Sequence, residues 1–512
     1  MLVKTYASAV HGINATSITV EVHASRGFKF HLVGLPDNAV KESQQRIVSS
    51  LKTNGFEWPG MCITVNMAPA DIRKEGSAYD LPLAVGILAA SGQISAKNLE
   101  TTVMMGELSL DGGLHPVKGV LPMALQAREA GFRRLIVPGA NAREAAVVKG
   151  LEVYGLGHLR EVVDMLEEKN TPEPVYIDLE AEFERQGNRY DVDFADVKGQ
   201  ENVKRALEIA AAGGHNVIMI GPPGAGKTML ARRLPTIVPP LSLEEALETT
   251  KIHSVAGKME SNASLMTCRP FRSPHHTISD VALVGGGSYP QPGEISLAHN
   301  GVLFLDELPE FKRTVLEVMR QPLEDRVITI SRARFAVEYP ASFMLVASMN
   351  PCPCGYYNHP DKPCVCTPGV VQKYLHRISG PLLDRIDIHI EVVPVPFEKL
   401  GDIGEAEPSL AVRERVTEAR KVQETRFKEE NGVFCNAQMT SRMLRKYCNL
   451  NESGRLILKN AMDKLGLSAR AYDRILKVSR TIADLEKCPD ILPSHLAEAI
   501  QYRNLDREGW AG

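Results

Sequence analysis

A glycine-rich segment carries the clearest chemistry in this sequence. It follows the apolar run 217–220, reads GPPGAGKT over residues 221–228, and leads into a helical pattern. This is the Walker A pattern, whose glycines let backbone N–H groups surround a β-phosphate while the N-terminus of the next helix attracts its negative charge. Lys227 is suited to bridge the β- and γ-phosphates, and Thr228 to bind Mg²⁺. The residues expected to bind the nucleotide are Gly221, Pro222, Pro223, Gly224, Ala225, Gly226, Lys227 and Thr228.

Polar residues end two further apolar runs, and we expect them to complete a site for ATP hydrolysis. The run GVLFLDE ends in Asp306, which suits the coordination shell of Mg²⁺, and in Glu307, which suits the base that polarises the attacking water. The run MLVASMN ends in Asn350, which we expect to lie between the other two strands and to orient that water. The plainer alternatives are a solvated strand end and a turn asparagine before Pro351.

Four of the nine cysteines gather in one short segment, as Cys352, Cys354, Cys364 and Cys366. Two pairs of thiols suit tetrahedral Zn²⁺, although the C-x-C spacing departs from the common C-x-x-C. His359 lies between the pairs and offers an alternative ligand. Because the segment has little apolar content, a metal would give it order, and we expect a structural zinc site. The alternative is a set of reduced thiols or a redox pair.

Parallel strands and covering helices must position these groups, and the hydrophobic pattern predicts both. Apolar or alternating runs at 18–24, 62–70 and 133–139 indicate strands, and helical spacing at 39–55 and 81–92 indicates helices. At about 150 residues per domain, the chain of 512 residues holds about three domains.

We therefore predict an α/β protein with a helical C-terminal domain. A charged, proline-containing stretch separates the first domain from the second, and the last domain has helical periodicity throughout. The predicted divisions are an N-terminal α/β domain at 1–168, a linker at 169–190, a nucleotide-binding core at 191–397 with a cysteine-rich insert at 352–366, and a helical domain at 411–512.

The composition narrows the class of protein. Fifty-nine basic and 62 acidic residues give a net charge of −3, which excludes a globally basic, histone-like binder but allows a local basic pore. The sequence has no run of 18 apolar residues, and its N-terminus lacks the apolar core of a signal peptide. We therefore expect a cytoplasmic protein without a membrane partner, whose nine cysteines do not form a disulfide framework.

The order of these motifs resembles an AAA+ ATPase. The segment FADVKGQENVKRAL (194–207) resembles the one near adenine in that superfamily. The stretch 291–352 resembles the Mg-chelatase and MCM branch, which carries a helix-2 insert and a hairpin before the asparagine strand. With VGLPDNAVKESQQRI (33–47) and NPCPCG (350–355), the chain resembles the ComM/YifB family of Mg-chelatase-like ATPases over essentially its whole length.

The resemblance implies a ring, a hexamer, with active sites between subunits. The segment GPLLDRID is similar to the arginine-finger segment, so Arg385 is expected to reach the γ-phosphate held by a neighbour. The alternative for Arg385 is a salt bridge with Asp384 or Asp387.

The resemblance also implies a phosphate contact from the helical domain. The segment LSARAYDRILKV is similar to the sensor-2 helix of the lid, with Arg470 as the expected contact and Arg474 as its rival. Arg377 stays unassigned.

The N-terminal domain resembles the proteolytic domain of Lon, a ribosomal S5 domain 2-like fold, over 74–92 and 106–138. Lon chemistry needs a serine activated by a lysine. Here the serine position falls near Tyr79 or Asp80, and the lysine position falls on Leu121. We expect the fold without its dyad, serving oligomerisation or substrate guidance. A displaced Ser77–Lys118 pair is a remote alternative.

Two basic segments are candidates for contact with DNA. The stretch 326–339 reads as a hairpin with Arg332 and Arg334 at its tip. The stretch 268–280 carries Arg269 and Arg272 with Phe271, His275 and His276 interleaved. Such tips would bind phosphates without sequence preference. The alternative is that these arginines are solvated or packed at a subunit interface.

These features support several functions. The resemblance implies a hexameric, ATP-driven motor on single-stranded or branched DNA, promoting branch migration in homologous recombination during natural transformation. The second candidate is a protein-remodelling ATPase, like Mg-chelatase or MoxR motor subunits, acting on a protein client. A Lon-type protease is disfavoured by the missing dyad, and an ATPase with some other substrate stays open.

Overall fold

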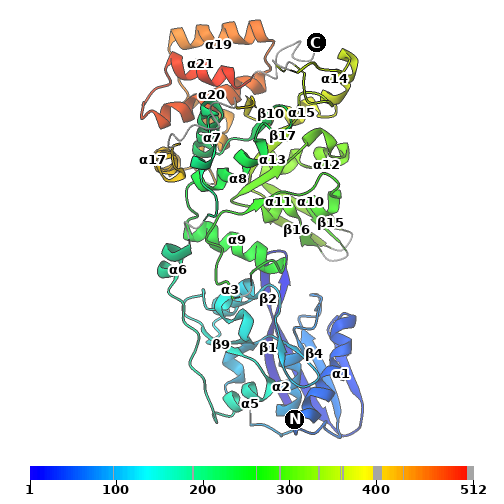
Figure 1. Ribbon diagram of the computed structural model, residues 1–512. Coiled ribbons are helices and arrows are strands. Elements are labelled where there is room, and N and C mark those ends of the chain that lie inside the picture. Colours follow the sequence, from blue (N-terminus) through cyan, green and yellow to red (C-terminus); the bar gives the residue numbers. More distant parts are fainter. Residues whose placement is uncertain are drawn as a thin grey trace.

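The computed structural model describes most of the chain as an N-terminal α/β domain, a second α/β core and a helical C-terminal region, arranged in that order along the molecule (Figure 1). No helix in these parts is long and apolar enough to cross a membrane. The described residues are 1–95, 97–186, 190–260, 262–287, 290–332, 335–357, 359, 362–395, 406–430 and 432–503.

A seven-stranded mixed sheet organises the N-terminal domain, in the order β3-β4-β2-β1-β5-β8-β9. Its centre is the antiparallel pair β1 (Leu2–His11) and β2 (Asn14–Ser25), and β5, β8 and β9 extend the sheet in parallel beyond β1. The remaining strands are β3 (Phe30–Val33), β4 (Cys62–Ala68), β5 (Thr102–Met104), β6 (Glu107–Leu108), β7 (Leu114–His115), β8 (Arg134–Pro138) and β9 (Glu152–Leu156).

Six helices accompany this sheet in the described residues. Helix α2 (Asp80–Ala90) is buried along its whole length, which explains its unbroken apolar sequence, and it packs on β1 and β2. The others are α1 (Asn38–Thr53), α3 (Val120–Glu129), α4 (Ala142–Ala145), α5 (Leu159–Leu166) and α6 (Leu179–Gln186). The predicted strands and helices of this domain are confirmed. The segment 169–190, predicted as a linker, contains helix α6, and its Ile177 and Leu179 are buried in the N-terminal core.

The second domain is built on a five-stranded parallel sheet, in the order β11-β14-β17-β10-β18. Strands β14, β17 and β10 are buried at every residue, which explains why they read as continuous apolar runs. The strands are β10 (Val217–Ile220), β11 (Phe271–Arg272), β14 (Val302–Leu305), β17 (Met344–Met349) and β18 (Ile388–Glu391).

Helices and two small hairpins surround this sheet. The predicted hairpin at 326–339 is present as β15 (Val327–Arg332) and β16 (Phe335–Pro340), and a shorter one pairs β12 (Gly285–Gly286) with β13 (Gln291–Pro292). The helices are α7 (Glu201–Gly213), α8 (Lys227–Ile237), α9 (Leu243–Val255), α10 (Asp280–Val284), α11 (Glu294–Leu297), α12 (Arg313–Val318), α13 (Arg320–Asp325), α14 (Pro368–Leu375) and α15 (Gly380–Leu383).

The C-terminal region is helical in its described part, as the sequence predicts. It shares one hydrophobic core with the second domain, because α17 packs on α7 and α8 while α20 packs on α7. Its helices are α17 (Ser409–Phe427), α18 (Ser441–Tyr447), α19 (Glu452–Leu465), α20 (Ala469–Leu485) and α21 (Pro493–Gln501). We call this region the lid.

Two of the contacts between the N-terminal domain and the second domain involve Glu144 and Gly12. Glu144 is buried, and its carboxylate accepts hydrogen bonds from the Ser254 hydroxyl at the end of α9 and from the Leu121 N–H. At the second contact, Gly12 in the β1–β2 turn lies against the side chain of Val337 in β16. The turn of the first sheet therefore supports the hairpin of the second (Figure 1).

Candidate nucleotide site

The polar residues predicted to do chemistry follow three neighbouring strands. Strand β17 lies between β10 and β14, so Asn350 falls between the phosphate loop and Asp306, as the sequence predicts. Because parallel strands end at one edge of a sheet, their C-terminal residues converge there. The site is therefore built at the carboxyl edge of the five-stranded sheet.

The phosphate loop turns sharply between β10 and α8, and its backbone runs close to the neighbouring strand. A Cβ atom at Gly221 would lie 2.2 Å from the carbonyl oxygen of Val392, so only glycine fits there. Helix α8 begins at Lys227, so its first N–H groups face the loop that precedes it. This is the geometry that binds a phosphate group at a helix N-terminus.

Lys227 is buried and bends back over the loop. Its Nζ donates to the carbonyls of Gly221 at 2.7 Å and Pro222 at 2.9 Å, and to Oδ1 of Asn350 at 3.2 Å. Burial lowers the pKa of Lys227, and the nearby carboxylates of Asp306 and Glu307 partly offset that effect. The lysine and asparagine predicted from separate segments are thus in direct contact.

Asp306 is held by three donors at the end of β14. Thr228 Oγ1 donates to its Oδ2 at 2.9 Å, the Glu307 N–H donates to its Oδ1 at 3.1 Å, and the Ser348 hydroxyl also donates to Oδ1. The pairing of Thr228 with Asp306 brings together the hydroxyl and carboxylate oxygens that Mg²⁺ prefers. The donor set therefore fits the predicted magnesium ion.

Ser348 is a site residue that the sequence interpretation missed. A signal was available, because residues two apart on a strand point to the same face, and Ser348 precedes Asn350 by two. Its hydroxyl orients the carboxylate of Asp306 from the strand that also carries Asn350.

Glu307 leaves the strand in the left-handed region, at φ 54°, and its side chain is 55% exposed. Its Oε2 lies 3.6 Å from Nδ1 of His276, which comes from the segment after β11. The ring of His276 lies tilted against the ring of His275 and packs edge to face with Phe311. A residue expected to contact DNA therefore lies beside the predicted base.

Arg385 differs from the expectation of an arginine presented to a neighbouring subunit. It is 5% exposed, its Nη2 lies 2.5 Å from Glu324 Oε1, and its Nη1 donates to the Pro381 carbonyl. The alternative pairing with Asp384 or Asp387 is not formed among the described residues. Glu324 supplies the counter-charge instead.

The lid arginines lie at the amino edge of the sheet, away from the phosphate loop of their own chain. Arg474 Nη1 lies 3.0 Å from Asp387, which immediately precedes β18, and Arg470 Nη1 lies 3.4 Å from Asp384. Strand β10 separates the two edges by four residues, about 13 Å. Within one chain, neither arginine is brought to Lys227.

In the segment 268–280, the structure differs from the predicted DNA interface at Arg269. Arg269 donates to the carbonyls of Pro239 and Asn300 and pairs with Glu245, so its guanidinium is used inside the fold. Burial lowers its pKa. It is a structural residue, because a guanidinium with its donors satisfied has little left for a phosphate.

Three further arginines belong to the predicted DNA interface. Arg272 forms a two-pronged ion pair with Glu294, at 2.6 and 2.8 Å, and is about one-third exposed. Arg332 ends strand β15 at the predicted hairpin tip. Arg334, the other predicted tip residue, lies outside the described residues.

The four clustered cysteines converge as a metal site requires. Their sulfur atoms all lie within 4.8 Å of one another, and three of the separations are 3.3, 3.5 and 3.7 Å. Four sulfurs at about 2.3 Å from zinc would be about 3.8 Å apart, so the set is consistent with a structural zinc site. His359 is outside this group; its Nδ1 accepts the Lys362 N–H.

The cysteine cluster is also in contact with the phosphate loop. Gly355, between the two halves of the cluster, has φ 84°, and a Cβ atom added there would lie 2.5 Å from Pro223 Cδ. A residue with a side chain would push against the loop. The segment that carries the cysteine cluster therefore packs directly against the phosphate loop.

The remote protease alternative has no geometric support. The Ser77 hydroxyl donates to Glu107, and the Lys118 side chain packs against Gly257 of the second domain. No bond joins Ser77 to Lys118 in the residues that the structure covers. A serine whose hydroxyl faces a carboxylate is not paired with the amine that Lon chemistry needs.

Comparison with known proteins gives matches along the whole chain. The family model described as magnesium chelatase, subunit ChlI, matches residues 193–400, that of subunit ChlI of Mg-chelatase matches 20–141, and that of the ChlI C-terminal part matches 406–503. The uncharacterized protein YifB of Salmonella typhimurium is 46% identical over 98% of this chain and 96% of its own length.

Two further relatives bear on function. The protein named competence protein ComM of Haemophilus influenzae is 46% identical over 98% of this chain and 97% of its own length. Lon protease 2 of Bacillus subtilis is 29% identical over 147 residues, which are 28% of this chain and 26% of the protease. The similarity to Lon is thus confined to a part of each chain.

Proposed function

This chain belongs to the YifB and ComM family of Mg-chelatase-like AAA ATPases, and from that premise we propose that it is one subunit of a hexameric ring that hydrolyses ATP to move DNA. The proposed task is branch migration in homologous recombination, during uptake of DNA in natural transformation. The observation that carries the DNA substrate is the near full-length similarity to a protein named for competence.

The convergence of Lys227, Thr228, Asp306 and Asn350 supports the ATPase chemistry. Lys227 and the loop N–H groups would hold the β- and γ-phosphates, and Thr228 with Asp306 would hold Mg²⁺. The bound ion would neutralise charge that develops on the phosphates. Glu307 would take the proton of the attacking water while Asn350 orients it.

The positions of the arginines support a shared active site. Arg385, Arg470 and Arg474 lie together at the sheet edge opposite the phosphate loop. A phosphate contact by Arg385 or Arg470 would therefore be made to the nucleotide of an adjacent subunit. Arg385 would have to exchange Glu324 for that phosphate.

The β15–β16 hairpin is the proposed DNA contact. Its strands rise from the core between α13 and β17, its tip carries Arg332, and the N-terminal domain supports it through Gly12. A basic tip facing a pore would bind the DNA backbone in a salt-dependent manner. Arg269 is not part of this proposal.

The deciding experiment is the ATPase rate of the purified protein with and without single-stranded and forked DNA, with Glu307→Gln as the blank. Stimulation by DNA supports the motor and leads to assays of branched DNA. An ATPase rate that is the same with and without DNA contradicts the motor function.

The similarity to ChlI in all three regions favours one alternative, a protein-remodelling ATPase. A DNA-insensitive ATPase that enriches one client on the Glu307→Gln form would support that function. A Lon-type protease is the least supported function, since Ser77 is bonded to Glu107. We propose that the N-terminal domain keeps a Lon-like fold without the dyad and serves assembly or substrate guidance.

A further inference from the structure

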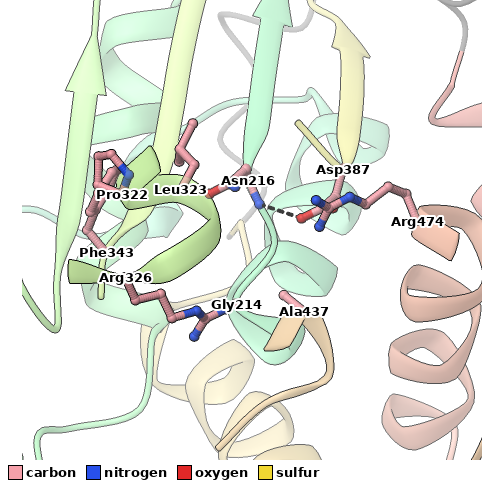
Figure 2. A pocket seen from close by; sticks show the side chains of 9 residues that line it. All are labelled: Gly214, Asn216, Pro322, Leu323, Arg326, Phe343, Asp387, Ala437 and Arg474. Atoms are coloured by element: carbon pink, nitrogen blue, oxygen red, sulfur yellow. Dashed lines mark hydrogen bonds and ion pairs between the residues drawn. The ribbon is translucent and has the colours of Figure 1, made fainter. Parts of the chain in front are cut away.

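A polar cavity lies at the amino edge of the five-stranded sheet, between the core and the lid (Figure 2). The space inside the cavity and in front of it, open solvent included, is about 340 Å³. Asn216 and Asp387 line it just before β10 and β18, Arg326 at the end of α13, and Ala437 and Arg474 from the lid. It lies one strand length, about 13 Å, from the phosphate loop.

The one carboxylate that lines the cavity is already engaged. Asp387 is 1% exposed, and its Oδ2 accepts the Asn216 N–H at 3.0 Å and lies 3.4 Å from His215 Nδ1. Its Oδ1 lies 3.0 Å from Arg474 Nη1. Arg474 therefore already neutralises the negative charge of Asp387, and His215 lies beside the other carboxylate oxygen.

Arg326 is partly buried and lines the same cavity without a bonded carboxylate in the described part of the chain. It follows α13 in the left-handed region, at φ 58°, and Figure 2 shows its guanidinium extending towards Gly214 and Ala437. No hydrogen bond or ion pair joins this guanidinium to another residue within the described ranges. Partial burial lowers the pKa of Arg326, the charges of Arg420 and Arg474 lower it further, and Asp387 offsets part of that effect.

Two more cationic side chains contact residues that line the cavity. Lys477 is buried and its Nζ donates to the Ala437 carbonyl at 2.9 Å; burial, with the charge of Arg474, lowers its pKa to about 8. Arg420 approaches Gly214, and its Nε is buried without a hydrogen-bond partner among the described residues. Two cationic side chains thus line the cavity, two more contact its lining residues, and one carboxylate lies among the lining residues.

We propose that this cavity binds a small tetrahedral oxyanion, of the phosphate or sulfate class, between Arg326 of the core and Arg474 of the lid. A cation held partly out of water without a bonded partner is costly, and an anion would offset that cost. Guanidinium groups match the oxygens of such an ion in pairs. The bound anion would link α13 to α20 and so fix the lid on the core. Within one chain this site is separated from the nucleotide site by the length of β10, and its binding of an anion does not depend on the proposed function.

The test measures phosphate binding while the nucleotide site is full. The full-length protein is saturated with Mg²⁺ and a non-hydrolysable ATP analogue, and inorganic phosphate is added against potassium chloride of equal ionic strength. Calorimetric titration should give one phosphate per chain, and the melting temperature should rise with phosphate. Chloride should not reproduce that rise.

The variants locate the binding. Arg326→Asn removes the charge with a residue that tolerates the left-handed backbone, and it should weaken phosphate binding at least tenfold. Arg326→Lys should retain part of the affinity, and Arg442→Ala, at an exposed lid arginine, should retain all of it. If Arg326→Asn does not fold, Arg420→Gln gives the same comparison. Absence of binding to the wild type, or equal binding to wild type and the charge-removing variant, overturns the proposal.

Discussion

The Glu307 carboxylate lies 3.6 Å from Nδ1 of His276, a residue from the loop after β11 and not from the strands that carry the rest of the site. The ring of His276 is itself fixed, with centroid distances of 4.1 Å to His275 and 6.4 Å to Phe311. Glu307 is otherwise half exposed. The proposed base is therefore positioned by a segment whose sequence suggested contact with DNA.

This relationship predicts a defect confined to turnover when His276 is replaced by alanine. The contacts of Lys227 and Thr228 would be intact, so the KM for ATP should stay unchanged. Loss of orientation at Glu307 should lower kcat about tenfold, or about 1.4 kcal/mol. Steady-state ATPase kinetics measure both values. His276→Gln should restore part of kcat, and a raised KM with normal kcat would contradict the positioning role.

Glu307→Gln should bind ATP and fail to turn it over. Losing a general base costs about 10²-fold to 10⁴-fold in rate, while the groups that hold the phosphates are untouched. Equilibrium binding of a fluorescent ATP analogue, beside a phosphate-release assay, separates the two effects. Lys227→Ala is the matched comparison, since it should lose binding itself. Normal turnover by Glu307→Gln would sink the assignment of the base.

The zinc interpretation predicts one metal ion per chain and a link to nucleotide binding. Elemental analysis of the purified protein should find zinc near equimolar amounts, and Cys364→Ser should lose it. Because Gly355 packs on Pro223, the variant should also bind ATP more weakly. Cys62→Ser, outside the cluster, is the control. Full zinc content in Cys364→Ser, or none in the wild type, would exclude this site.

Much of the fold followed from hydrophobic periodicity. The buried strands before Gly221, Asp306 and Asn350 were predicted because each is an apolar run of strand length that ends in a polar residue. The strand order that brings Lys227 to Asn350 also followed, since the motifs resemble those of a family with a known arrangement. The clustered cysteines were visible from their spacing alone.

Side-chain partners could not be predicted in the same way. The pairing of Arg269 with Glu245 and of Arg385 with Glu324 joins residues far apart in the sequence, and a basic residue in a short segment reads the same whether it is solvated or buried. The position of the lid likewise depends on packing across the whole core. For that reason Arg470 lies at Asp384 and not at the phosphate loop.

Because Arg385 pairs with Glu324 in one chain, Glu324 and the phosphate of a neighbouring subunit's nucleotide would compete for the same guanidinium in the proposed ring. If Arg385 acts on the nucleotide of a neighbour, Arg385→Ala should abolish hydrolysis alone and regain it when mixed with Lys227→Ala subunits, which supply the arginine. Glu324→Gln should keep Arg385 in place but remove the charge of its ion-pair partner. ATPase assays of mixed and single preparations test this. Failure of the mixture to recover activity would show that Arg385 acts only within its own chain.

The ion pair between Asp387 and Arg474 predicts a pH-dependent contribution to stability. Although burial alone would raise the pKa of Asp387, Arg474 and His215 hold that pKa well below its usual range. A depressed carboxyl pKa contributes stability that is present above the unfolded value, about 3.9, and is lost as the pH falls towards the folded value. Asp387→Asn should thus lower the free energy of unfolding by about 3 kcal/mol at pH 7 and by progressively less below pH 4. Asp384→Asn, at the more exposed pair with Arg470, should cost less than about 1 kcal/mol. Urea unfolding of both variants across pH measures the difference, and a pH-independent loss in Asp387→Asn would show that its charge is not what joins the lid to the core.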